Sequence, residues 1–98
     1  MTKKGKSEWF FCIVQDPGTS LEQLMGFKET KTKIDFIPAF NTKEEAQSCF
    51  LLMPKDVINL KYEVQAIIKE DIFFQTKQTD HKVFLMDDKG QIIKELEE

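Results

Sequence analysis

Apolar residues are grouped along the chain in runs whose spacing predicts β-strands. Residues 8–14 form a run that is continuously apolar from Trp9 onward and rich in aromatic and β-branched side chains, which predicts a central strand covered on both faces. Residues 60–68 alternate between apolar and polar positions, the pattern of a strand with one buried face. Residues 33–40 predict another strand, in which Pro38 cannot donate a backbone hydrogen bond and should lie at an edge or near an end.

Two further strands are expected at residues 82–87 and 91–96, on either side of Asp88, Lys89 and Gly90. Glycine readily adopts a positive φ, so this spacing predicts a tight turn. The chain should therefore end in a β-hairpin.

The clearest helical signal begins at Thr42. Thr42 and Glu45 have the spacing of a capping box, in which the two residues satisfy each other's free backbone N–H groups. The apolar residues that follow recur at helical spacing and predict one buried face, formed by Ala46, Cys49, Phe50 and Met53. Pro54 should end the helix. Because burial of this face would supply much of the stability of a small domain, Phe50→Ala should largely unfold the protein.

Two weaker helical segments are expected at residues 19–25 and 70–76. In the first, Thr19 or Ser20 can cap the helix, and Glu22 follows Thr19 at capping-box spacing. The apolar face of this helix would consist of Leu21, Leu24 and Met25, and the helix would end at Gly26. Residues 70–76 fit a strand or a short helix, and their acidic start favours the helix.

This order of elements predicts an α+β fold in a single domain over residues 8–98. We expect one mixed sheet of four or five strands, with two or three helices packed on it and the hairpin at its C-terminal end. Crossover helices should join the first strands. Residues 1–7 are polar and lysine-rich and should form a flexible tail.

The composition supports one folded domain and argues against specific nucleic-acid binding. Of the 98 residues, 41% are hydrophobic and nine are Phe, which is enough apolar area for a core without a disulfide or a metal. All 14 basic residues are Lys and the net charge is −3, so the arginine forks that read bases and grip phosphates are missing. A short basic patch at Lys28, Lys31 and Lys33 is interrupted by acids and is more typical of a solvated strand edge.

The two cysteines, Cys12 and Cys49, lie inside apolar stretches, where cysteine is most often a small buried hydrophobe. The N-terminal lysines are followed by too few apolar residues for a signal peptide, and no stretch is long enough to span a membrane. We therefore expect free thiols, a cytoplasmic location and no membrane partner.

The residue types that catalysis or metal binding requires are sparse. The single histidine, His81, has no nucleophile or orienting group at a recognisable spacing, which predicts a solvated loop residue. Two distant cysteines and one histidine cannot build a structural zinc site, and the adjacent carboxylate pairs are typical of capping or surface positions. We expect no catalytic residue, no metal and no cofactor.

One stretch is a candidate ligand-binding site. Gly18, Thr19 and Ser20 lie where the first strand passes into the expected helix, and the free N–H groups of a helix start can hold an anion. The stretch lacks the spacing and the Gly-Lys-Ser/Thr ending of a P-loop, which argues against nucleotide binding.

Residues 36–46 resemble the SseB-type domain, in which a strand with a Pro-x-Phe step leads through Thr-x-Glu-Glu into a helix. The order of the later segments, 64–66, 70–72, 83–85 and 90–93, is similar as well, so the resemblance covers residues 34–93. It implies a small bacterial regulatory or interaction domain, with no catalytic residues to carry over.

Two functions follow from these observations. The first is a non-enzymatic interaction or regulatory module that binds another protein or forms a homodimer, because exposed sheet edges invite pairing. The alternative is a domain that binds a small ligand or an anion at the helix start formed by residues 18–20.

Overall fold

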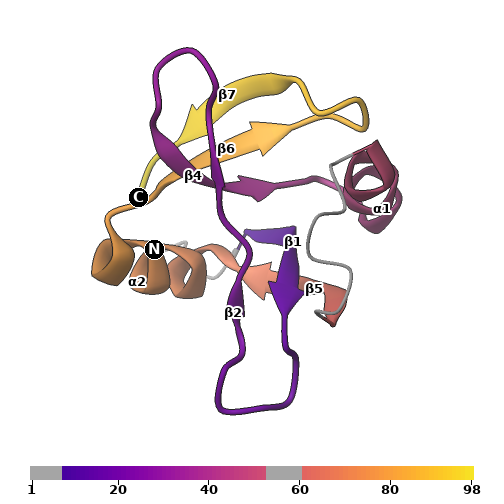
Figure 1. Cartoon of the computed structure of the whole chain (residues 1–98), viewed down its shortest axis with the longest axis vertical. Helices are drawn as coiled ribbons and strands as arrows, with labels where there is room; N and C mark the ends of the chain where they lie inside the picture. Colours follow the sequence, from indigo (N-terminus) through magenta and orange to yellow (C-terminus); the bar gives the residue numbers. More distant parts are fainter. Residues whose placement is uncertain (1–7, 53–60) are drawn as a thin grey trace, which may run out of the picture.

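Seven strands in two sheets and two helices make up the computed structural model, which describes residues 8–52 and 61–98. Figure 1 shows the sheet that contains β6 and β7 above the sheet that contains β1 and β5. The fold is α+β, as the sequence predicts. The expectations for residues 1–7 and for Met53 and Pro54 lie outside the described residues.

The first sheet has three antiparallel strands in the order β2-β1-β5. β1 (Trp9–Gln15) lies at its centre, between the short β2 (Gln23–Leu24) and β5 (Tyr62–Ile68). The prediction of a central first strand is therefore confirmed.

The second sheet has four strands in the order β3-β4-β6-β7. β3 (Phe27–Lys28) and β4 (Asp35–Ala39) are antiparallel, β4 and β6 (Lys82–Met86) are parallel, and β7 (Ile92–Leu96) closes a hairpin with β6. Gly90 has a φ of 82° in the β6–β7 turn, so the predicted C-terminal hairpin is confirmed.

Pro38 is the fourth of the five residues of β4, so it lies near an end of the strand, as the sequence predicts. On one side it pairs with Phe84 of β6. On the other side, the pairing with β3 ends at Phe36, and the next contact is the bridge between Phe11 and Phe40. Pro38 thus occupies a local gap in the ladder, where its missing N–H removes no bond.

The first helix, α1 (Lys43–Leu52), starts as its capping box predicts. The backbone N–H of Glu45 donates to Oγ1 of Thr42 at 3.1 Å, and the Thr42 hydroxyl donates to the Glu45 carboxylate at 3.2 Å. Ala46 and Cys49 are buried and Phe50 is half-buried.

The second helix, α2 (Lys69–Thr79), confirms the helical interpretation of its segment. Glu70 and Asp71 lie in its first turn, where the helix dipole favours acids. Asp80 ends the helix with a left-handed φ of 61°.

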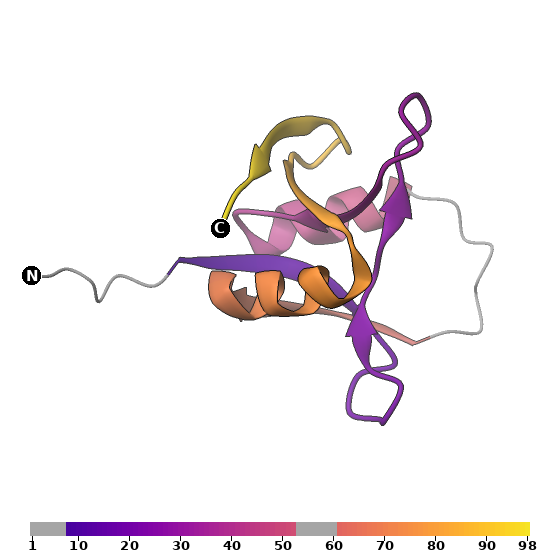
Figure 2. The same cartoon turned by 90° about the vertical axis from the view of Figure 1, so that its left-hand side faces the viewer.

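The core consists of two clusters that meet at β1. Phe10, Cys12 and Val14 face the cluster that contains Ile72 of α2. Ile13 points to the opposite side, into the cluster under α1. Figure 2 shows β1, in indigo, running between the two helices, which explains why its apolar run is continuous.

The expectation of one sheet with four or five strands is wrong. The described strands divide into two sheets, which touch at the antiparallel bridge between Phe11 and Phe40. The link after β1 is a hairpin to β2 and contains no crossover helix.

The expectation of a helix at residues 19–25 is wrong, and the reason lies in the local backbone conformation. Asp16 and Gly18 adopt positive φ values of 52° and 78°, which reverse the chain directly after β1. Leu21, which should face the core, is 71% exposed, and only Leu24 and Met25 are buried.

Candidate functional site

The predicted ligand-binding residues Gly18, Thr19 and Ser20 are all exposed in the β1–β2 loop. The backbone N–H of Gly18 donates to Oε1 of Glu22 at 2.7 Å, and the Thr19 hydroxyl donates to the carbonyl of Asp16 at 2.8 Å. The loop's own carboxylate therefore takes the N–H that an anion would need. Residues 16–21 form turns and bends, so the helix start on which the anion-binding alternative depended is absent.

Both cysteines are free thiols inside the core. Burial raises the pKa of Cys12 to about 12. Burial also raises the pKa of Cys49, and the nearby charges of Asp87 and Asp88 act in the same direction. The reactive form of cysteine is the thiolate, and a raised pKa keeps the thiol protonated, so both cysteines are poorly suited to act as nucleophiles.

The basic patch near β3 is engaged in local pairing. Lys28 forms an ion pair with Asp35 at 2.9 Å across the β3–β4 ladder, and this hydrogen bond lowers the pKa of the Asp35 carboxyl. Within residues 8–52 and 61–98, no three acidic, cysteine or histidine side chains are grouped as a metal site would require. No helix in the same residues has the length and apolar character needed to cross a membrane.

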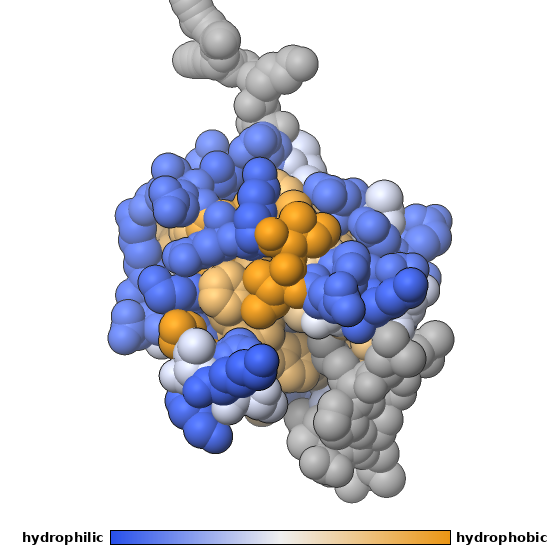
Figure 3. All heavy atoms as spheres, turned by 90° about the horizontal axis from the view of Figure 1, so that it is seen from above, coloured by the Kyte–Doolittle hydropathy of each residue, from blue (hydrophilic) through white to orange (hydrophobic). Residues whose placement is uncertain are grey.

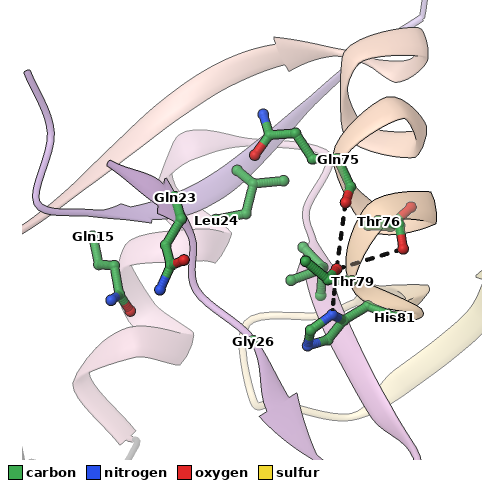
Figure 4. A pocket seen from close by; sticks show the side chains of 9 residues that line it. Gln15, Gln23, Leu24, Gly26, Gln75, Thr76, Thr79 and His81 are labelled. Carbon is green, nitrogen blue, oxygen red and sulfur yellow. Dashed lines mark hydrogen bonds between the residues drawn. The ribbon is translucent and has the colours of Figure 1, made fainter. Parts of the chain in front are cut away.

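A polar cavity of about 280 Å³ lies between the C-terminal half of α2 and the chain around β2. Figure 4 shows side chains from several elements converging on it. Its polar lining consists of Gln15, Gln23, Gln75, Thr76, Thr79 and His81. We call it the glutamine–histidine cavity.

The hydrogen bonds of Thr79 determine how His81 presents itself to this cavity. The Thr79 hydroxyl lies 3.3 Å from the carbonyl of Gln75 and 3.4 Å from that of Thr76, and 2.6 Å from Nδ1 of His81. The hydroxyl and Nδ1 therefore form the shortest of these contacts, and which of the two donates depends on the tautomer of the imidazole. Nε2, the other ring nitrogen, lies beside Gly26.

His81 lies in the loop between α2 and β6, as the sequence predicts, and is half-buried there. Neutral amides and one imidazole can bind a neutral molecule that offers both donors and acceptors. The sequence carries no signal for the cavity, because its residues come from segments around positions 15, 23–26, 37 and 75–81 that only the fold brings together.

The outer edge of β5 is the second candidate site. β5 is the last strand in the order β2-β1-β5, and no described residue pairs with its outer side. At one end of β5, the backbone N–H of Asp16 donates to the carbonyl of Lys61 at 2.8 Å. At the other end, the backbone N–H of Lys69 donates to the carbonyl of Glu8, also at 2.8 Å. In an antiparallel ladder, alternate residues exchange both bonds with the neighbouring strand. The backbone N–H and C=O groups of every second residue from 61 to 69 therefore point towards β1.

The intervening residues point their backbone groups outward. Val64, Ala66 and Ile68 present N–H and C=O groups on the open side of β5. Their side chains share one face of the sheet, and Ala66 is exposed. Trp9 lies directly opposite Ile68 in the ladder and is 57% exposed.

The helix α1 covers only part of this face. It packs beside Ile13 and Val64, where Phe50 contacts Tyr62 with 5.0 Å between ring centroids. The end formed by Trp9 and Ala66 is left open. We call the outward backbone of residues 64–68, together with Trp9, the β5 edge.

The other described edges are less suited to pairing. β2 and β3 have two residues each. β7 exposes Ile92 and Ile93, and Figure 3 shows apolar atoms between hydrophilic ones on the face seen from above. The β6–β7 ladder has a register shift, however, and the exposed Lys94 and Glu95 place charges on the strand. Bulges and charges are the usual means by which an edge avoids pairing.

Comparisons with protein-family models, curated proteins and solved structures found no match to this chain. The SseB-type resemblance stays a prediction.

Proposed function

We propose that this chain is a non-enzymatic interaction module that binds an extended strand of a protein at the β5 edge. The observation that carries the proposal is the row of outward N–H and C=O groups on Val64, Ala66 and Ile68. An added strand would complete the ladder, and the backbone bonds would supply affinity without requiring one particular sequence.

The side chains around the edge supply the second part of the binding energy. A strand laid against β5 would cover the exposed Ala66 and the half-buried Ile68, and a long side chain could reach Trp9. Exposed aromatic residues such as tryptophan are common anchors of protein interfaces. The outward backbone groups and the exposed apolar side chains of the β5 edge therefore both favour the binding of an added strand.

The proposal can be tested by amide exchange on the ¹⁵N-labelled chain. The probes are peptides of about ten residues with alternating β-branched and polar positions, including one with the sequence of residues 61–69. We expect at least one peptide to slow the exchange of the Val64, Ala66 and Ile68 amides in a saturable manner. If no peptide protects these three amides, strand addition at β5 is excluded.

Two proline variants provide a matched pair for this experiment. Ala66→Pro removes an outward N–H and should leave the fold intact while it abolishes peptide binding. Gln65→Pro removes an N–H that faces β1 and should unfold the sheet. Peptide binding that survives in folded Ala66→Pro would place the contact elsewhere.

The glutamine–histidine cavity supports a second candidate function, the binding of a small neutral molecule. Three side-chain amides and the imidazole of His81 line the same 280 Å³. Uracil, which alternates donors and acceptors, is a suitable probe. We expect it to shift the side-chain amide signals of Gln15 and Gln75 in the wild type and to have less effect in His81→Ala. Unchanged signals at about 10 mM uracil would argue against this function.

A further inference from the structure

We infer that the strand received by the β5 edge is β5 of a second copy of this chain, paired antiparallel about Ala66. The inference rests on the proposed function and adds the identity and register of the partner. Three features of β5 carry it: the direction of its backbone groups, its charges and its apolar face.

The backbone restricts the possible registers. Two copies can exchange hydrogen bonds only between residues that point outward, which within β5 are Tyr62, Val64, Ala66 and Ile68. A two-fold axis at Ala66 pairs Ala66 with itself and Val64 with Ile68 of the second copy. Val64, Ala66 and Ile68 of both copies then all have outward partners, while Tyr62 lies opposite Glu70, in α2 of the second copy.

The charges select this register from its neighbours. With the axis at Ala66, Glu63 lies opposite Lys69 of the second copy, the first residue of α2, whose backbone N–H continues the ladder to Glu8, and the symmetry makes this pair twice. With the axis at Gln65, Lys61 would lie opposite Lys69, which is repulsive. With the axis at Val64, Glu63 would face Gln65, which carries no charge, and the position opposite Lys69 lies outside the described residues.

The positions of the two charged side chains agree with this arrangement. Glu63 is exposed. The ammonium group of Lys69 lies 3.2 Å from a carboxylate oxygen of Glu8, and its side chain is 25% exposed. In the pair of copies, Lys69 would lie between Glu8 of its own chain and Glu63 of the second, and an ammonium group has enough protons for both.

The apolar face is continuous across the same axis. Val64, Ala66 and Ile68 share one side of the strand, so each copy adds the same three residues to a common surface. Ala66 on the axis is small enough to face its own copy at the spacing of a hydrogen-bonded pair, about 5.5 Å between Cα atoms. Trp9 then lies beside Ile68, next to Val64 of the second copy.

Association through one strand of this length is weak. Interfaces of this size lie below about 1,000 Å² and belong to transient complexes, so a dissociation constant of roughly 10 µM to 1 mM is expected. Sedimentation equilibrium should show a mass that rises with concentration from 11.5 kDa towards twice that value. The emission of Trp9, the only tryptophan, should shift to the blue over the same range.

Charge variants test the register. Glu63→Lys and Lys69→Glu each replace two attractive pairs by two repulsive ones and should weaken association about tenfold. An equimolar mixture of the two variants restores both pairs and should associate like the wild type. Asp88→Lys makes the same charge change as Glu63→Lys in the β6–β7 turn and should leave the self-association constant within about twofold of wild type.

The outcomes separate the inference from the proposed function. A chain that stays monomeric up to about 1 mM overturns the inference, while protection of the edge amides by the peptides would still support strand addition. A dimer that persists in folded Ala66→Pro also overturns the inference, because its interface lies elsewhere. If the single charge variants weaken association but their mixture does not restore it, the register about Ala66 is wrong.

Discussion

The imidazole of His81 occupies the space that a side chain at position 26 would need. An ideal Cβ on Gly26 would lie 2.8 Å from Nε2 of His81 and 3.3 Å from Cδ1 of Ile37. The φ of Gly26 is not in the left-handed region. The requirement for glycine is therefore one of space, and it is imposed by a ring that Thr79 holds from its other side.

Gly26→Ala should destabilise the protein by about 1–2 kcal/mol, because the new methyl group displaces the His81 ring from Thr79. In a His81→Ala background the same change should cost much less, since the obstructing atoms are gone and alanine restricts the unfolded chain. Urea denaturation of the four proteins gives the coupling energy. An equal cost in both backgrounds would contradict the steric explanation.

Thr42→Ala should lower the unfolding free energy by about 1 kcal/mol, because the N–H of Glu45 loses its cap. For a domain of this size, that corresponds to a fall of about 4–8 °C in the melting temperature. Ser48→Ala, at an exposed position of the same helix, is the control and should change stability by less than about 0.5 kcal/mol. Similar melting temperatures for the two variants would show that the capping bond contributes nothing.

The contrast between α1 and the β1–β2 loop shows which local signals in the sequence are reliable. Both segments have a threonine followed three residues later by glutamate. In α1, the Thr42 hydroxyl and Glu45 bond to each other. In the loop, Glu22 binds the N–H of Gly18 instead, because Gly18 at a φ of 78° turns its N–H towards that side chain. The same Thr-x-x-Glu spacing therefore occurs at a helix start in α1 and in a turn after β1, and the spacing alone does not distinguish the two structures.

Strand pairing was beyond the reach of local patterns. Each strand longer than two residues was predicted within two positions of its observed start, since each depends on its own apolar residues. The division into two sheets depends on the parallel pairing of β4 with β6 and the antiparallel pairing of β1 with β5, which join distant segments. The β5 edge follows from that division. An open edge was expected from the sequence, but its identity required the topology.

Phe40→Ala should be the most damaging of the phenylalanine substitutions compared here. Phe40 is fully buried where the two sheets meet, so its loss should cost about 3–5 kcal/mol. Phe50 is half-buried, and Phe50→Ala should cost about half as much, which revises the expectation that it would largely unfold the protein. Phe74→Ala, at a side chain that is 67% exposed, is the control and should cost less than about 0.5 kcal/mol. Chemical denaturation measures all three, and a cost for Phe50→Ala equal to that for Phe40→Ala would restore the earlier expectation.

Cys12 should make the protein less stable in alkali. Burial raises the pKa of its thiol from the ordinary value of 9.0 to about 12, so above pH 9 the unfolded chain loses a proton that the folded chain keeps. The unfolded state then binds fewer protons, and the unfolding free energy falls as pH rises through this range. The contribution is fully present below pH 9 and should have fallen by about 2 kcal/mol near pH 10.5. The measurement is the difference in unfolding free energy between the wild type and Cys12→Ala, in which the titration of all other groups cancels. A difference that is the same at pH 7 and near pH 10.5 would mean that the folded protein releases this proton as readily as the unfolded chain.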